Sequence, residues 1–223
     1  MDYLDLTNSF LIETGIGDPV QTLEDQGDDI MQAAHWINAA WAAFQRKRLW
    51  PFRKVEGSLP VTAGATSYTF TSLSLSSGAL IVPHSFYSPL GGVRHVDYER
   101  VRAARRSGQN TDPSRVQLIA VHNEAFHTYP VVNNAQSIAF DYWRAVQTLR
   151  KQADIPYGLP SDFHMMLVHL AIAHYGVLAG GQEGANLYAH HAKLFNAALT
   201  EYMTFVGVTA SSEVPPVTHT LIR

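Results

Sequence analysis

The chain has 223 residues, of which 46% are hydrophobic and 16% are charged, and its formal net charge is −3. This length suffices for one sizeable core or two small ones, and the net charge excludes a global basic field that would recruit nucleic acid or an anionic membrane. The low charged fraction leaves a largely neutral surface that is suited to contact with other proteins.

The chain contains no cysteine, which excludes disulfides and thiolate nucleophiles and fits a protein made in a reducing cytoplasm. The first five residues are acidic and lack the basic segment of a signal peptide, so we expect no export signal of that kind. No segment reaches the roughly 18 uninterrupted apolar residues of a membrane span, and we expect no membrane partner.

The N-terminal part of the chain predicts two helices. Tyr3, Leu6 and Phe10 form one apolar stripe over residues 1–14, and Gly15 follows as a left-handed C-cap. After a turn, a longer helix has its apolar residues at helical spacing, namely Ile30, Ala33, Ala34, Ile37, Trp41 and Phe44. Pro51 ends this helix, because proline disfavours helical geometry in the residue before it.

The period changes between about residues 55 and 145, where short segments lie between turns rich in Gly, Ser, Asn and Pro. These segments predict strands at residues 59–61, 68–70, 80–82, 115–119 and 137–143. Inside this β-rich insert, residues 98–106 predict a short helix or turn, and residues 107–113 predict a flexible loop.

Two further helices are predicted after the insert. The first starts near Ser161, a possible N-cap, and has an apolar face made of Phe163, Leu167, Leu170, His174 and Leu178. We interpret residues 180–184 as the turn that follows. The second helix has apolar residues three and four apart, the seam of an antiparallel helical hairpin, at Tyr188, Ala192, Phe195, Leu199, Tyr202 and Val206.

These elements predict an α+β fold, an antiparallel bundle of about four helices with the β-rich insert between the second and the third. The expected divisions are residues 1–54 and 151–206 for the bundle, 55–150 for the insert and 207–223 for an extended C-terminal segment. That last segment shows neither helical nor alternating periodicity. It is interpreted either as a frayed terminus or as an arm that orders on a partner.

Eleven histidines raise the question of a metal site, above all His164, His169 and His174 in one predicted helix and His190 and His191 in the next. Steps of five place successive histidines about 140° apart around a helix, since each residue turns about 100°. Ligands of one metal need steps of three or four instead. With no nucleophile motif either, we expect no metal, no cofactor and no catalytic residue.

Basic residues gather in two clusters. The first lies around the end of the second helix and includes Arg46, Arg48 and Arg53; the second comprises Arg100, Arg102, Arg105 and Arg106. Both clusters are interpreted either as solvated charge or as contacts with another subunit or partner, because guanidinium groups suit carboxylates and phosphates. No helix-turn-helix or zinc-finger spacing indicates groove readout of DNA.

Several packing and turn motifs follow one another along the chain. They are Tyr-Leu-Asp-Leu at residues 3–6, His-Trp-Ile-Asn-Ala-Ala-Trp at 35–41 with Gln45, Trp-Pro-Phe at 50–52, Val-Asp-Tyr-Glu at 96–99, Phe-Asp-Tyr-Trp-Arg at 140–144, and Ile-Pro at 155–156 with Leu-Pro-Ser-Asp-Phe-His at 159–164. Over residues 1–206 their order resembles the head-to-tail adaptor (connector) proteins of tailed bacteriophages, the family that includes the tail-tubular-protein-A-like adaptors.

The resemblance implies a non-enzymatic structural protein of the virion, made in the host cytoplasm and located at the portal vertex. It implies a ring of identical subunits, commonly twelve, that docks under the portal protein, contacts the next tail or neck protein and continues the DNA channel for genome retention and ejection. Double-stranded DNA would pass without sequence-specific binding. The C-terminal arm would grip the portal, with Val214, Pro215, Pro216, Leu221, Ile222 and Arg223 as contacts.

Three alternatives stay open at the level of the sequence. The chain could be a neighbouring neck component, such as a stopper or a tail-completion protein. A metal-dependent enzyme would require stoichiometric bound metal. A DNA-binding module that uses the arginine clusters would require salt-sensitive affinity for DNA.

Overall fold

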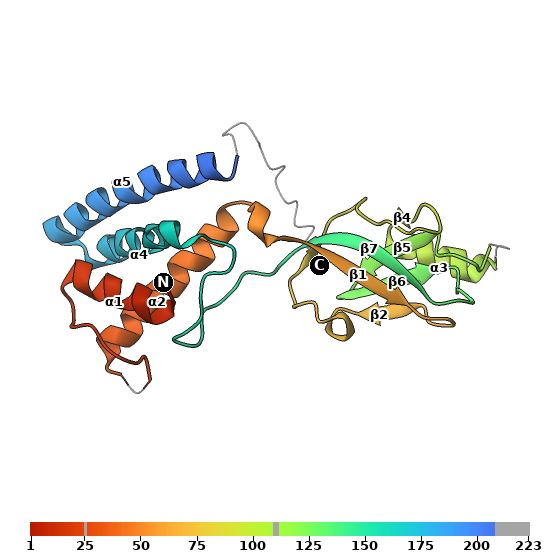
Figure 1. Ribbon diagram of the computed structural model, residues 1–223, viewed down its shortest axis with the longest axis horizontal. Helices are drawn as coiled ribbons and strands as arrows, with labels where there is room; N and C mark the ends of the chain where they lie inside the picture. The colour runs from red at the N-terminus through yellow and green to blue at the C-terminus, as the bar shows by residue number, and fades with distance from the viewer. Residues whose placement is uncertain (25, 109–111, 208–223) are drawn as a thin grey trace. The chain divides into compact units, whose positions relative to one another are not determined.

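The computed structural model describes residues 1–24, 26–108 and 112–207. The chain divides into two compact units, a helical unit made of Met1–Phe52 and Val146–Arg223 and a β-rich unit made of Arg53–Ala145. Figure 1 labels the helices and most of the strands. The α+β class expected from the sequence is confirmed, because helices and sheets are both present and are largely segregated along the chain.

The helical unit contains α1 (Tyr3–Thr14), α2 (Asp28–Lys47), α4 (His164–Ala179), preceded by a short 3-10 turn (Ser161–Phe163), and α5 (Gly181–Phe205). Asp2 caps α1 by accepting a hydrogen bond from the Asp5 N–H, and the Asp5 side chain caps the Asp2 N–H in return. Gly15 ends α1 with φ +67°, as the sequence predicts.

The core of the helical unit is built from aromatic rings and aliphatic side chains on α1, α2, α4 and α5. Trp50 is fully buried; its ring stacks on Phe44 with centroids 4.5 Å apart, and its Nε1 donates to the Phe44 carbonyl oxygen at 2.7 Å. Tyr202 on α5 lies against both rings. The segment after α2 is therefore held to the same core as the C-terminal helix.

The extended segment that enters the helical unit after Ala145 is held by two amide side chains of α2. The Asn38 Oδ1 accepts from the Leu149 N–H at 2.8 Å, and its Nδ2 donates to the Leu149 carbonyl oxygen at 2.8 Å. Gln45 makes the same pair of bonds with the backbone of Gln147, at 2.8 and 3.0 Å. Gln45 lies seven positions after Asn38, about two helical turns, which places both on one face of the helix.

Helices α4 and α5 pack more closely than the sequence indicates. A Cβ atom on Gly176 would lie 2.7 Å from the Gly184 carbonyl oxygen, so the two backbones nearly touch. The expected turn at residues 180–184 is wrong in extent, because α5 already begins at Gly181. The expected apolar faces are also wrong at two positions: Leu178 is 70% exposed and Tyr188 is 49% exposed, whereas His191 is buried.

The β-rich unit contains two sheets. One has the order β1 (Lys54–Val61), β7 (Gln136–Trp143) and β3 (Leu80–Ile81), with antiparallel pairing throughout. The other has the order β2 (Ser67–Thr69), β6 (Ala125–Tyr129), β5 (Leu118–His122) and β4 (Arg94–His95), in which only the β4–β5 pair is parallel.

The two sheets share one hydrophobic core, to which Leu59, Ile138 and Phe140 contribute from one sheet and Ile119 and Phe126 from the other. Helix α3 (Tyr98–Ser107) packs on β5 and β6 through Val101, which is fully buried with Ala120 and near Tyr129. The helix expected at residues 98–106 is thereby confirmed. Residues 109–111 of the expected loop at 107–113 lie outside the described residues.

The strand expected at residues 115–119 is displaced to Leu118–His122, and β6 and β4 are additional to the predicted strands. Arg115 and Val116 precede the ladder, since the Gln117 N–H bonds to the Tyr129 carbonyl oxygen at the end of the β5–β6 pairing.

In residues 1–24, 26–108 and 112–207, no helix combines the length and the apolarity that a membrane crossing requires.

Candidate partner-contact sites

The first arginine cluster belongs to two different environments. Arg46 is exposed at the end of α2, while the Arg48 guanidinium lies 5.3 Å from the Trp50 ring centroid. Arg46 and Lys47 line a shallow groove of about 350 Å³ whose other walls include Leu170 and Phe195. Arg53, by contrast, is 5% exposed, and its Nε donates to the Arg144 carbonyl oxygen at 3.1 Å. Its guanidinium therefore links the residue before β1 to the residue after β7.

The second cluster is likewise divided. Arg102 pairs with Glu99 at 2.7 Å on the surface of α3, and this carboxylate raises the pKa of the guanidinium. The Arg105 side chain extends to the sheet that contains β2 and β6. Its Nη2 donates to the carbonyl oxygens of Thr66 and Thr128 at 2.8 and 3.1 Å. Arg100 and Arg106 are exposed. A contact role for these arginines stays a prediction.

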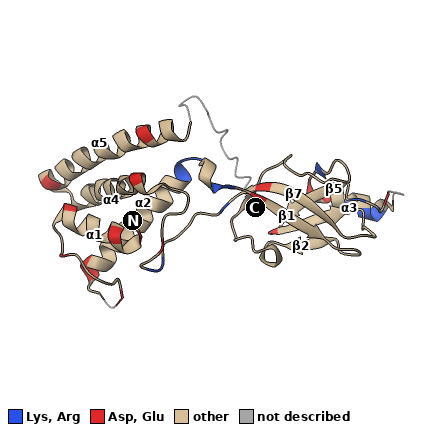
Figure 2. Cartoon of the chain, viewed as in Figure 1, with Lys and Arg blue, Asp and Glu red and all other residues tan. Residues whose placement is uncertain are grey.

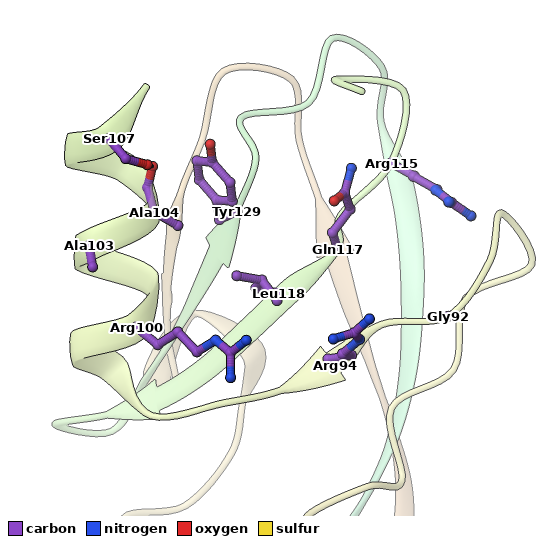
Figure 3. A pocket seen from close by; sticks show the side chains of 10 residues that line it. All are labelled: Gly92, Arg94, Arg100, Ala103, Ala104, Ser107, Arg115, Gln117, Leu118 and Tyr129. Atoms are coloured by element: carbon purple, nitrogen blue, oxygen red, sulfur yellow. The ribbon is translucent and has the colours of Figure 1, made fainter. Parts of the chain in front are cut away.

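A cavity of about 560 Å³ lies between α3 and one edge of the β4–β5–β6 sheet, and we call it the arginine cavity. It is lined by Gly92, Arg94, Arg100, Ala103, Ala104, Ser107, Arg115, Gln117, Leu118 and Tyr129. Figure 3 shows Arg100 extending from α3 across the cavity, Arg94 standing on β4, and Leu118 on the floor. Three cations thus line the cavity, and none of the described lining residues is acidic.

The wall that contains Arg115 is fixed by the backbone. The Arg115 Nη1 donates to the Leu90 carbonyl oxygen at 3.1 Å. Gly91 lies directly against this guanidinium, where a Cβ atom would collide with Nη1. Burial of the Nε without a hydrogen-bond partner among the described residues leaves one donor of this group unused. The chemistry of the cavity is that of an anion site.

Sequence reasoning found Arg100 but did not single out Arg94 or Arg115 for this site. Arg94 follows Gly91 and Gly92 in a two-residue strand, and Arg115 comes after the expected loop. The parallel β4–β5 pairing, with Arg94 opposite Leu118, places Arg94 in the wall of the cavity, and Arg115 joins the lining from the segment just before β5. Short strands of this kind carry little periodicity, so the sequence offered no signal for their proximity.

The histidines of α4 and α5 were the candidate metal ligands in the sequence. No group of three or more candidate ligands occurs within the described ranges. His169 on α4 and His191 on α5 bond to each other through their Nδ1 atoms at 3.1 Å, and desolvation by burial is the main cause that lowers the pKa of both.

The predicted arm residues Val214, Pro215, Pro216, Leu221, Ile222 and Arg223 lie outside the described residues.

A search of curated proteins finds no match for this chain. The family model described as SU10 adaptor protein matches residues 1–217, almost the whole chain. The chain therefore belongs to the SU10 adaptor protein family and is a bacteriophage adaptor protein.

Proposed function

We propose that this chain is a structural, non-enzymatic protein that forms a ring under the portal and joins the capsid to the tail. Family membership carries the proposal: it implies association with other phage head and tail proteins and a place in the virion neck. The ring, its twelve subunits, the continuous DNA channel for genome retention and ejection, and the closer relation to tail-tubular-protein-A-like adaptors belong to the proposal.

The exposed side chains of the helical unit support a role in assembly. Large apolar residues with exposed fractions of 49% or more occur on all four of its helices, namely Ile12, Met31, Val177, Leu178, Tyr188 and Phe205. Single exposed apolar residues are ordinary on any protein surface. Val177 and Leu178, however, stand side by side at the α4–α5 turn and are 66% and 70% exposed, as suits contact with a neighbour.

The partners in this proposal are the portal protein, neighbouring copies in the ring, the next tail or neck protein, and double-stranded DNA that passes without sequence-specific contact. Portal contact is assigned to Val214, Pro215, Pro216, Leu221, Ile222 and Arg223. An arm of this composition, with two prolines and the apolar pair Leu221 and Ile222, suits a segment that binds in extended form.

Light scattering on the purified chain, on its cognate portal and on their mixture tests this function. We expect the mixture to have the mass of a portal with a ring of bound subunits. A version that ends at Gly207 should give an unchanged far-ultraviolet circular dichroism spectrum and should fail to join the portal. If the full chain stays a monomer beside the portal, the proposed ring under the portal is wrong. If the full chain and the shortened chain both dock, the arm assignment alone is wrong.

A further inference from the structure

We propose that the arginine cavity receives carboxylate side chains from the acidic segment between Glu13 and Asp29 of a second copy of this chain. The inference rests on the proposed function, since it names one surface through which neighbouring subunits of the ring meet. It assigns the positive side of the contact to Arg94, Arg100 and Arg115 of one copy.

The cavity contains guanidinium groups that are not paired with any other described residue. The guanidinium groups of Arg94 and Arg100 form no hydrogen bond or ion pair with any other residue in the described part of the chain, and both side chains are exposed. Arg115 is held in the opposite wall by Leu90. A carboxylate entering from the side of α3 would meet the guanidinium groups of Arg94 and Arg100, and guanidinium groups form charge-assisted hydrogen bonds with carboxylates.

The shape of the cavity favours a polypeptide side chain over the DNA backbone. A volume of about 560 Å³ is the size of a cleft for a small molecule or a few side chains, whereas duplex DNA carries one charge per about 1.7 Å along a continuous surface. Leu118, Ala103 and Ala104 give the cavity an apolar floor and side. Such walls suit the methylene groups of Asp and Glu below their carboxylates.

The charge distribution of the chain identifies the source of the carboxylates. The β-rich unit has nine Lys and Arg against six Asp and Glu, a net charge of +3, while the helical unit has seven against thirteen, a net charge of −6. Residues 1–45 contain eight acidic residues and neither Lys nor Arg. Figure 2 shows the acidic residues around α1 and α2 and the basic residues on α3.

The acidic segment is accessible and its carboxylates are available. Glu13, Asp18, Glu24, Asp28 and Asp29 are all exposed, and none of them forms an ion pair within the described residues. Because the acidic segment and the cavity are different surfaces, their contact between two copies is heterologous. A heterologous contact repeats from copy to copy and closes into a ring if the rotation allows it.

Charge reversal on each side, followed by reversal on both, tests the inference. The variants are Arg94→Glu with Arg100→Glu, then Asp18→Lys with Glu24→Lys, then all four changes in one chain. The association constant between copies is measured by sedimentation over a concentration series, with and without the cognate portal and at several ionic strengths. The matched controls are Lys193→Glu and Glu201→Lys, exposed charges on α5 that lie outside both surfaces.

Each double reversal should weaken association between copies by at least about tenfold, because like charges then face each other, and the combined variant should recover most of the loss. The controls should associate as the unmodified chain does. If Arg94→Glu with Arg100→Glu associates normally, or if the combined variant shows no recovery, the inference is overturned while the adaptor function stands. Loss of binding to double-stranded DNA with unchanged association would assign the cavity to phosphates and also overturn it. A chain that never associates, with or without the portal, overturns both proposals.

Discussion

At the scale of single residues, amide side chains on helices form hydrogen bonds with the backbone of extended segments, as a neighbouring strand does in a sheet. Asn38 and Gln45 each offer one acceptor and one donor to the backbone of an extended segment. Asn8 on α1 does the same for Val20, accepting at 2.8 Å and donating at 2.9 Å. Segments without regular structure thus have their backbone groups satisfied where they cross the helices.

Replacement of Gln45 by Leu should destabilise the helical unit. Gln45 is fully buried, so the change leaves the N–H and carbonyl oxygen of Gln147 without their partner. We expect a loss of about 1–3 kcal/mol in the free energy of unfolding, measured by urea denaturation. Gln32→Leu, at an exposed position of the same helix, is the control. An unchanged unfolding midpoint for Gln45→Leu would contradict this account of the bond pair.

The paired histidines predict how stability depends on pH. Burial lowers the pKa of His164, His169, His174 and His191 from 6.5. Glu13 on α1 acts in the opposite direction on His169 and His191, and His190 adds to the lowering of both. In the unfolded chain these groups take up protons below about pH 6.5, whereas in the folded chain they do so only at lower pH.

The free energy of unfolding should therefore fall as the pH drops below about 6.5 and should keep falling until the folded-state pKa values are passed. Replacing both His169 and His191 by Gln should make this decline shallower. Urea denaturation at pH 7.5, 6.5, 5.5 and 5.0 measures it, and exposed His35→Gln on α2 is the control. Equal slopes for the double variant and the unmodified chain would show that the pair does not contribute.

At the scale of elements, the close approach of α4 and α5 depends on two glycines. Each occupies a place where the partner helix leaves no room for a side chain: a Cβ on Gly184 would lie 2.5 Å from the Gly176 carbonyl oxygen. Backbone atoms cannot move aside as the end of a flexible side chain does. The α4–α5 distance is thus set by these two positions.

Gly176→Ala should force the helices apart and lower the free energy of unfolding by about 1–3 kcal/mol, even though alanine has the higher helix propensity. Thermal and urea denaturation measure the effect. Gly27→Ala, at the N-cap of α2 where no atom lies within 4 Å of the new Cβ, should change stability by much less. A Gly176→Ala variant as stable as the unmodified chain would show that the helices can separate without loss.

The long helices were predictable because each carries a strong apolar period with a recognisable start or end, such as Gly15 or Pro51. The α5 seam was correct at Phe195, Leu199 and Tyr202, which are buried. It was wrong at Tyr188, because the nearby glycine contact brings the backbones so close that only a small residue at 184 fits between them. That contact depends on tertiary packing, which the period of one helix does not encode.

At the scale of the whole molecule, the sequence predicted an α+β protein but not how the strands pair. Strands of two or three residues, such as β3 and β4, bring together side chains far apart in the chain. Arg94 and Arg115 line one cavity with Arg100 only in the folded unit, so the arginine cavity could not be predicted from the spacing of the arginines. The sequence also contains the difference in net charge between the β-rich unit and the helical unit. This difference can be calculated only once the boundaries of the two units are known.

The pairing of β1 with β7 bears on the order in which the chain folds. The helical unit is interrupted by 93 residues, from Arg53 to Ala145, and joining the ends of a flexible loop of that length costs about 4 kcal/mol of entropy. In the folded β-rich unit, the Arg144 N–H bonds to the Arg53 carbonyl oxygen at 2.8 Å, which already holds the two ends together. We therefore expect the β-rich unit to act as the nucleus of folding and the interrupted helices to assemble after it, as if a short loop joined them.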